Sequence, residues 1–152
     1  MAHSELRGTR VAEIYLAPGS RLPMRATDAV EAEAGKGLVG DRYHGSRHRQ
    51  VTIQSREALD RTAEQLGYDF SSGATRRNIT VDVGDIPTTP GARLRIGEVE
   101  FEVVRVAAPC RLMEDAVGPG ATAALRGRAG SACRVLTSGT IRVGDAVELL
   151  DG

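Results

Sequence analysis

The residues of this sequence best suited to chemistry are its two cysteines, Cys110 and Cys133. Cys110 follows Pro109, which restricts the chain before it, and precedes Arg111, whose positive charge favours a thiolate. A thiolate is both a nucleophile and a soft metal ligand. The alternative is a small buried thiol without reactivity, which is what most lone cysteines are. Cys133 has no preceding proline and lies at the mouth of an apolar strand, so the buried alternative is favoured there.

The setting of the two cysteines indicates a reducing compartment. Neither belongs to a CxxC pair, which excludes a zinc ribbon and a thioredoxin-type motif. The first ten residues carry no apolar run like that of a secretory signal, and no segment approaches the roughly 20 apolar residues that span a bilayer. We therefore expect a cytoplasmic protein with no membrane partner. A Cys110–Cys133 disulfide is compatible with the spacing but is disfavoured in that compartment.

A second group of polar residues, Asp41, His44 and His48, lies in a segment rich in glycine and arginine. The spacing of four between the histidines resembles a helical metal-binding pair, but the flanking glycines oppose a helix, so zinc is disfavoured. A loop ordered by a turn between Asp41 and the backbone, with basic side chains facing a ligand, is the favoured interpretation. A solvated surface loop is the alternative.

Two further arginine groups could bind an anion. Arg76, Arg77 and Asn78 directly precede an apolar strand. Neighbouring side chains of a strand point to opposite faces, so at most one of the two arginines faces inward, where it would clamp a phosphate or carboxylate. The other is a surface residue, and Asn78 could brace the loop that holds them. Arg128, in the basic segment 126–130, is a weaker candidate because that segment matches no phosphate-loop pattern.

Composition limits the class of ligand. The chain has 152 residues, enough for one domain with a real core, and 20 basic residues balance 20 acidic ones. A chain with zero net charge has no overall field to attract nucleic acid, and aromatic residues are only 3% of the sequence, which disfavours base stacking. Local arginine clusters in a neutral protein suit a small anionic ligand better than a polyanion.

Many short strands separated by glycine and proline must position these residues. The alternating pattern predicts strands at 10–16, 26–33, 50–54, 78–83, 93–96, 99–106, 134–136, 140–143 and 146–149. A helix is predicted after Ser55, its N-cap, ending at Gly67, and a short helix at 121–128. A long loop is expected at 34–49. The fold class is therefore mainly β with one or two short helices (α+β), in a closed or partly open β-barrel.

In order and spacing, these segments resemble the MOSC family, named for the C-terminal domain of molybdenum-cofactor sulfurase. The matching segments are Gly40-Asp41-Arg42-Tyr43-His44-Gly45, Gln50-Val51-Thr52-Ile53-Gln54-Ser55, Arg76-Arg77-Asn78-Ile79, Pro90-Gly91-Ala92-Arg93-Leu94-Arg95-Ile96-Gly97, Pro109-Cys110 and Ile141-Arg142-Val143-Gly144-Asp145. The resemblance implies a small stand-alone member with a MOSC-type β-barrel. It implies one domain over residues 1–152, with its core at about 9–149.

The resemblance also implies a ligand, the molybdenum cofactor, which is a pterin dithiolene with a phosphate. Cys110 would be the molybdenum ligand and the catalytic residue. The residues expected to bind the cofactor are Asp41, His44, Arg76, Arg77, Asn78 and Arg128. Many members carry Gly-Glu-Asn where this chain has Arg76-Arg77-Asn78, so a glutamate-based role does not transfer.

Two functions follow from the resemblance, and the sequence leaves both open. In the first, the protein reduces N-hydroxylated substrates and takes electrons from a separate electron-transfer protein, since no flavin or iron–sulfur motif is present. In the second, it is a non-catalytic sulfur carrier with a persulfide on Cys110, or a cofactor-binding module. Pyridoxal phosphate, used by a neighbouring domain in the sulfurases, is not expected because Lys36 is the only lysine and lies in no recognisable pyridoxal site.

Overall fold

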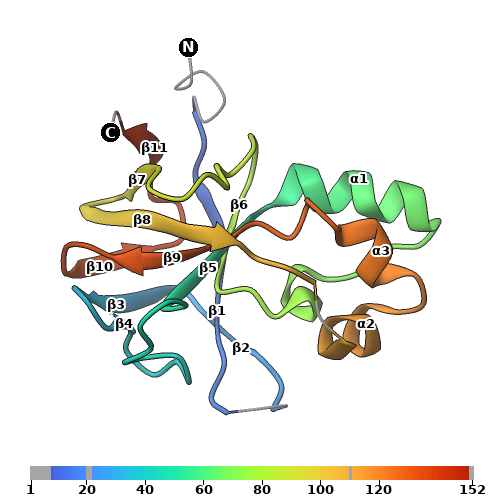
Figure 1. Ribbon diagram of the computed structural model, residues 1–152, viewed down its shortest axis with the longest axis horizontal. Helices are drawn as coiled ribbons and strands as arrows, with labels where there is room; N and C mark the ends of the chain where they lie inside the picture. Colours follow the sequence, from blue (N-terminus) through green and yellow to red (C-terminus); the bar gives the residue numbers. More distant parts are fainter. Residues whose placement is uncertain (1–7, 20–21, 110, 151–152) are drawn as a thin grey trace.

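Eleven strands form two sheets in the computed structural model, which describes residues 8–19, 22–109 and 111–150 (Figure 1). The strands are β1 (Val11–Leu16), β2 (Arg25–Thr27), β3 (Ala29–Glu33), β4 (Gly37–Leu38), β5 (Val51–Ser55), β6 (Ile79–Val81), β7 (Arg93–Ile96), β8 (Val99–Val106), β9 (Ser131–Val135), β10 (Gly139–Arg142) and β11 (Val147–Leu150). The helices are α1 (Arg56–Leu66), α2 (Arg111–Val117) and α3 (Ala121–Leu125), with a 3₁₀ turn η2 (Ser72–Thr75). The prediction of a mainly β chain with few short helices is confirmed.

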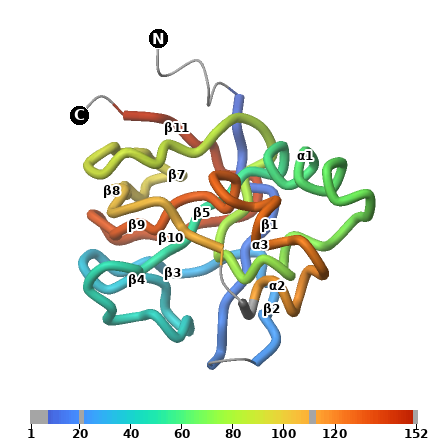
Figure 2. Tube along the Cα trace, turned by 45° about the vertical axis from the view of Figure 1, so that its right-hand side comes forward, coloured from blue at the N-terminus to red at the C-terminus, as the bar shows by residue number. Residues whose placement is uncertain are grey.

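The larger sheet has eight strands in the order β11-β7-β8-β9-β5-β6-β1-β2. Its described pairs are antiparallel except β5 and β6, which run parallel and are connected through α1 and η2. The sheet curls so strongly that its edge strand β11 comes back to the start of β1: the amide of Val11 donates to the Asp145 carbonyl and the amide of Val147 to the Thr9 carbonyl, both at 2.9 Å. The result is the half-barrel visible in Figures 1 and 2.

Alternating apolar residues explain the best-predicted part of this sheet, the β7–β8 hairpin. Val99, Phe101 and Val103 on β8 are buried, while the intervening residues are only partly so. Gly97 makes the turn with φ +58°, a conformation that favours glycine. Both strands have the bounds predicted from the sequence.

The second sheet, in the order β10-β3-β4, corrects two predictions. The single strand predicted at 26–33 is divided at Asp28 into β2, which pairs with β1, and β3, which pairs with β10. The predicted loop at 34–49 contains β4, whose Leu38 pairs with Ala32. The alternation is in fact broken at Asp28, a polar residue in phase with the apolar Val30 and Ala32, and the change of sheet falls at this residue.

The helices gather on one side of the sheet around a small apolar core of their own (Figure 1). That core is formed by Leu59, Met113, Ala121, Leu125 and Ala129. α1 follows Ser55 and ends at Gly67 as predicted, with Gly67 in the left-handed region at φ 83°. α2 was not predicted, and α3 ends at Leu125 rather than at 128. No helix in the described ranges is long and apolar enough to cross a lipid bilayer.

Candidate functional site

Arg77 is the most buried charged side chain described, with 1% of its surface exposed. Its Nε donates to the Ala129 carbonyl at 3.0 Å and its Nη2 donates to the Ala108 carbonyl at 2.9 Å. The planar guanidinium therefore ties two segments that are far apart in the sequence. One of them, Ala107–Pro109, leads directly into Cys110. The Ala107 amide adds a third tie by donating to the Gly130 carbonyl at 2.9 Å.

Cys110 itself lies outside the described residues. The chain is described up to Pro109 and again from Arg111, where α2 begins. The predicted reactive residue thus stands between an anchored strand end and the start of a helix, and a permanent positive charge from Arg77 is held beside the segment that precedes it.

Asp41 and Asn78 are buried and bonded to each other, although 37 positions separate them. Asn78 Nδ2 donates to Asp41 Oδ1 at 3.1 Å, and Asn78 Oδ1 accepts from the Thr52 amide at 3.0 Å. Asp41 Oδ1 also accepts from the Ala17 amide, and Oδ2 accepts from the Tyr43 amide at 3.1 Å. The last bond is the predicted turn between Asp41 and the backbone. These two side chains are engaged in holding backbone, and they join β1, β5 and the loop before β6.

Arg76 differs from its neighbour. It caps η2 in the left-handed region, with φ 60° and ψ 31°, and its Nη1 donates to the Leu22 carbonyl at 2.8 Å on the exposed surface. The expectation that one arginine of the pair is inward and one is at the surface is met, with Arg77 inward. The reason given for it was wrong, because neither arginine is in a strand: Arg76 is the C-cap of η2, and Arg77 lies between η2 and β6.

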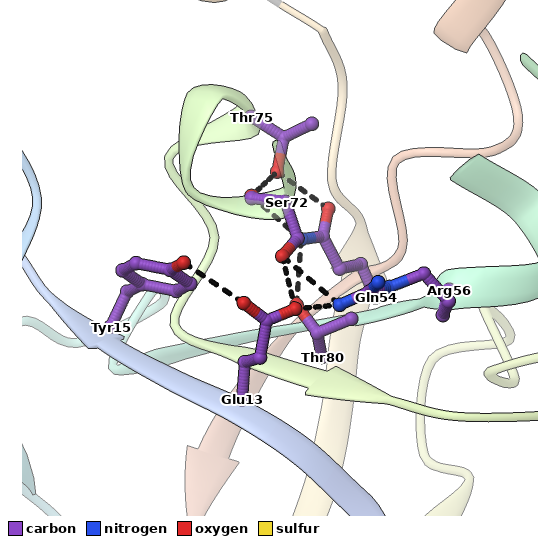
Figure 3. Close-up of polar contacts among 7 residues, drawn as sticks. All are labelled: Glu13, Tyr15, Gln54, Arg56, Ser72, Thr75 and Thr80. Atoms are coloured by element: carbon purple, nitrogen blue, oxygen red, sulfur yellow. Dashed lines mark hydrogen bonds and ion pairs between the residues drawn. The ribbon is translucent and has the colours of Figure 1, made fainter. Parts of the chain in front are cut away.

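A polar network holds η2 and with it the position of Arg76 (Figure 3). Glu13 on β1 is its centre: its carboxylate accepts from the hydroxyls of Tyr15 and Ser72 and forms an ion pair with Arg56. Because Arg56 begins α1 and Ser72 begins η2, one carboxylate connects β1 to both elements of the crossover.

Gln54, at 0% exposure, extends this network into the interior. Its Nε2 donates to Thr80 Oγ1 at 2.9 Å and its Oε1 accepts from Thr75 Oγ1 at 2.7 Å. The buried amide is therefore bonded at both ends, which is the arrangement that makes a polar group tolerable in a core. The sequence did not single out Glu13, and Gln54 appeared there only within a segment that resembles the family, because the bonds of both side chains depend on pairing between distant segments.

His44 belongs to the same turn as Asp41, whose carbonyl accepts from the His44 amide at 3.1 Å, but its side chain contacts a different residue. Its Nε2 lies 3.1 Å from Glu33 Oε1, and both side chains are substantially exposed. Nearby, the guanidinium groups of Arg42 and Arg49 lie 4.6 and 4.8 Å from the centre of the Tyr43 ring. Within the described ranges, no three His, Cys, Asp or Glu side chains gather closely enough to hold a metal ion.

Arg128 also lies apart, against α1. Its Nη1 donates to Gln65 Oε1 at 2.9 Å. The backbone joins Arg128 to the anchor of the Cys110 segment, because the carbonyl of its neighbour Ala129 accepts from Arg77. The predicted cofactor residues thus divide into an interior group (Asp41, Arg77 and Asn78), Arg76 at the adjoining surface, and the outlying His44 and Arg128.

Cys133 has the environment of a structural thiol. It is fully buried on β9 and faces Val51 and Val103 on the neighbouring strands. Burial raises the pKa of its thiol to about 12, so the thiolate is not available at neutral pH. The preference for the buried alternative at this position agrees with the structure.

Comparison with known proteins gives the fold and the family. The YuaD protein from Bacillus subtilis has a similar crystal structure, with a TM-score of 0.78 and 19% identity, covering 93% of this chain and 95% of that one. YiiM from Geobacillus stearothermophilus has a TM-score of 0.74 and 18% identity, covering 94% and 75%. YiiM from Escherichia coli has a TM-score of 0.70 and 19% identity, and the match covers 94% of this chain and 70% of that one.

No curated protein matches the chain in sequence. A family model does: that of the MOSC domain matches residues 40–148, from the Asp41 turn to the last strand. This range contains the crossover, the arginine pair, the Cys110 segment and most of the half-barrel described above, and on this match the chain belongs to the MOSC domain family.

Proposed function

We propose that this protein binds the molybdenum cofactor, with Cys110 as the molybdenum ligand, and reduces N-hydroxylated substrates. The observation that carries the proposal is the placement of Arg77, whose buried guanidinium anchors the segment leading into Cys110. A fixed positive charge near a cysteine favours the thiolate, and a thiolate is the soft ligand that molybdenum requires.

The two arginines that follow η2 suit an anionic cofactor. Arg76, at the surface end of η2, presents a second guanidinium that would bind its phosphate, since arginine pairs well with phosphate. Asp41 and Asn78 would act indirectly, by holding the strand ends in place. When bound, the cofactor supplies a redox-active metal. Reduction of an N-hydroxylated compound breaks the N–O bond, takes up two electrons and two protons, and releases water. A separate electron-transfer protein would supply the electrons.

A second candidate function uses the same residues without a metal. The charge that favours a thiolate on Cys110 also favours the anion of a persulfide, so the protein would carry sulfur on this residue. A third form of the proposal keeps the bound cofactor but no reaction: the protein would then be a cofactor-binding module without turnover.

The deciding measurement is elemental analysis of protein purified from a host that makes the cofactor. We expect near-stoichiometric molybdenum in the wild type and in Cys133→Ser, and none in Cys110→Ser, with circular dichroism confirming that all three are folded. Absence of molybdenum together with a labile sulfur on Cys110 would replace the first proposal with the sulfur carrier. Neither molybdenum nor labile sulfur in any of the proteins would overturn both.

A further inference from the structure

A cavity of about 310 Å³ lies where the start of α1 meets residues 85–88 and 127–130. Its walls include Ser55, Arg61 and Arg128, together with the backbone of Gly127 and Gly130. Two arginines, a hydroxyl and a helix N-terminus in one hollow are groups that bind anions. The function proposed above uses none of these residues, and Arg128 alone was among the residues that the resemblance implied for the cofactor.

Ser55 supplies the observation that a helix end alone would not. Its side chain is 3% exposed, and its Oγ has no hydrogen-bond partner among the described residues. Ser55 is the N-cap of α1, yet its hydroxyl does not cap the first turn. A buried hydroxyl without a partner is costly and uncommon in folded proteins. A ligand in the cavity would give it one.

The same missing cap leaves the helix end open. The first amides of an α-helix have no acceptor within the helix, and a serine at this position normally satisfies one of them. Ala58, in the first turn of the 11-residue α1, also lines the cavity. The positive end of the helix dipole therefore faces the hollow, where it favours a negative charge.

The two arginines complete the site. Arg128 donates to neutral acceptors, Gln65 Oε1 at 2.9 Å and the Ala124 carbonyl, so those bonds leave its positive charge uncompensated. Arg61 Nη2 lies 3.1 Å from Asp85 Oδ1, but both side chains are more than half exposed. An exposed pair of this kind contributes little, so an oxyanion can displace Asp85 from Arg61.

The acidic residue in the first turn of α1, Glu57, is bound to backbone. Glu57 Oε1 accepts from the Gly84 amide at 2.5 Å, which holds this carboxylate on the backbone beside the cavity wall. From these contacts we propose that the cavity is an oxyanion site that takes a phosphate group, with Arg128, Arg61 and the Ser55 hydroxyl as ligands. This assigns Arg128 to a site of its own, and the proposal stands whether or not Cys110 holds a cofactor.

Titration of labelled protein with inorganic phosphate, followed by amide NMR at constant ionic strength, tests the site. We expect saturable shifts at the amides of Ser55, Ala58, Gly127 and Gly130, with a Kd on the order of millimolar. Arg128→Gln should raise the Kd at least tenfold, and Ser55→Ala by about threefold to tenfold, since each removes a donor to a charged ligand. The matched control is Arg95→Gln on β7, whose guanidinium pairs with Glu148 outside the cavity.

A parallel titration with a phosphomonoester such as ribose 5-phosphate identifies the source of the group. Tighter binding of the ester assigns the site to a phosphorylated metabolite, and equal binding assigns it to the free ion. Cys110→Ser should bind phosphate like the wild type, which separates this result from the fate of the proposed cofactor. Shifts that do not saturate, or an Arg128→Gln variant that binds as well as the wild type, would overturn the proposal.

Discussion

Arg77 shows how one side chain can fix two segments of the backbone at once. Lysine could not replace it, because a single ammonium cannot reproduce the planar fork that reaches the Ala108 and Ala129 carbonyls in two directions. Removing the fork leaves two carbonyl groups without this donor, and buried polar groups that lose a partner cost about 1–3 kcal/mol each. The segment before Cys110 would be the first to lose its position.

Arg76 carries a local conformational cost that a substitution can measure. It is the only non-glycine residue with positive φ in the described part of the chain, and the left-handed region costs an ordinary residue about 1–2 kcal/mol. Arg76→Gly and Arg76→Ala both remove the guanidinium, but only glycine relieves the backbone. We expect the glycine variant to be more stable than the alanine variant by about 1 kcal/mol in urea unfolding. Equal stabilities would show that the turn relaxes around the side chain.

For single residues, the sequence predicted which side chains matter better than it predicted which groups they contact. The asparagine and aspartate were expected to organise a loop, and the Asp41 turn has the expected form. Their bond to each other could not be predicted, because it depends on β1, β5 and β6 meeting in the sheet. The inward position of Arg77 likewise follows from the end of η2 and not from any period in the sequence.

Among the elements, the crossover from β5 to β6 contributes most to the site. α1 and η2 lie between these two parallel strands: Ser55 at the start of α1 lines the cavity, and Arg77, two residues after η2, binds the carbonyl of Ala108 in the segment before Cys110. The ion pair of Glu13 with Arg56 fixes the start of this connection against β1. Both proposed sites therefore depend on the same connection.

The segment between α3 and β9 is close to β5 at Gly130, and this gives a matched pair of variants. A Cβ at Gly130 would overlap the Ile53 carbonyl oxygen, whereas a Cβ at Gly127 would meet nothing within 4 Å. Both glycines have positive φ, so alanine strains the backbone at either position. We expect Gly130→Ala to destabilise the protein by about 3 kcal/mol or more and Gly127→Ala by about 1 kcal/mol in urea unfolding. Similar losses would mean that β5 and residue 130 can separate.

Elements with a strong local signal were the ones predicted correctly. The β7–β8 hairpin has regular alternation and a glycine turn, and α1 has an apolar face and Gly67 at its end. α2 has seven residues and follows a proline and a cysteine, so it offers too few turns for a periodic pattern. β4 has two residues and is a strand only because β3 lies beside it.

For the whole molecule, Cys133 predicts how stability depends on alkaline pH. Its pKa is raised by burial to about 12 in the folded protein and is about 8.5 in an unfolded chain. Between these values the unfolded state loses the thiol proton and the folded state keeps it. The contribution of this thiol to the free energy of unfolding is therefore fully present below about pH 8.5 and is lost as pH rises toward 12. The slope from this group approaches about 1.4 kcal/mol per pH unit.

Comparison of the wild type with Cys133→Ala isolates this contribution from other groups that titrate in the same range. We expect the free energy of unfolding of the wild type, measured in urea from pH 7 to 11, to fall more steeply than that of the variant above about pH 8.5. Parallel curves for the two proteins would contradict the assignment of a buried, protonated thiol.

The contact between the start of β1 and the segment before β11 has a consequence for synthesis. Residues 9–11 exchange backbone hydrogen bonds with residues 144–147, and β3 pairs with β10, so early strands depend on partners more than a hundred residues later. Pairings between such distant strands make folding slow, because the entropy cost of closing a long loop comes before the stabilising contacts can form. On the ribosome, β1 and β3 emerge first and remain without these partners until residues 139–147 have left the exit tunnel. The nascent domain is therefore most exposed to aggregation just before this segment emerges.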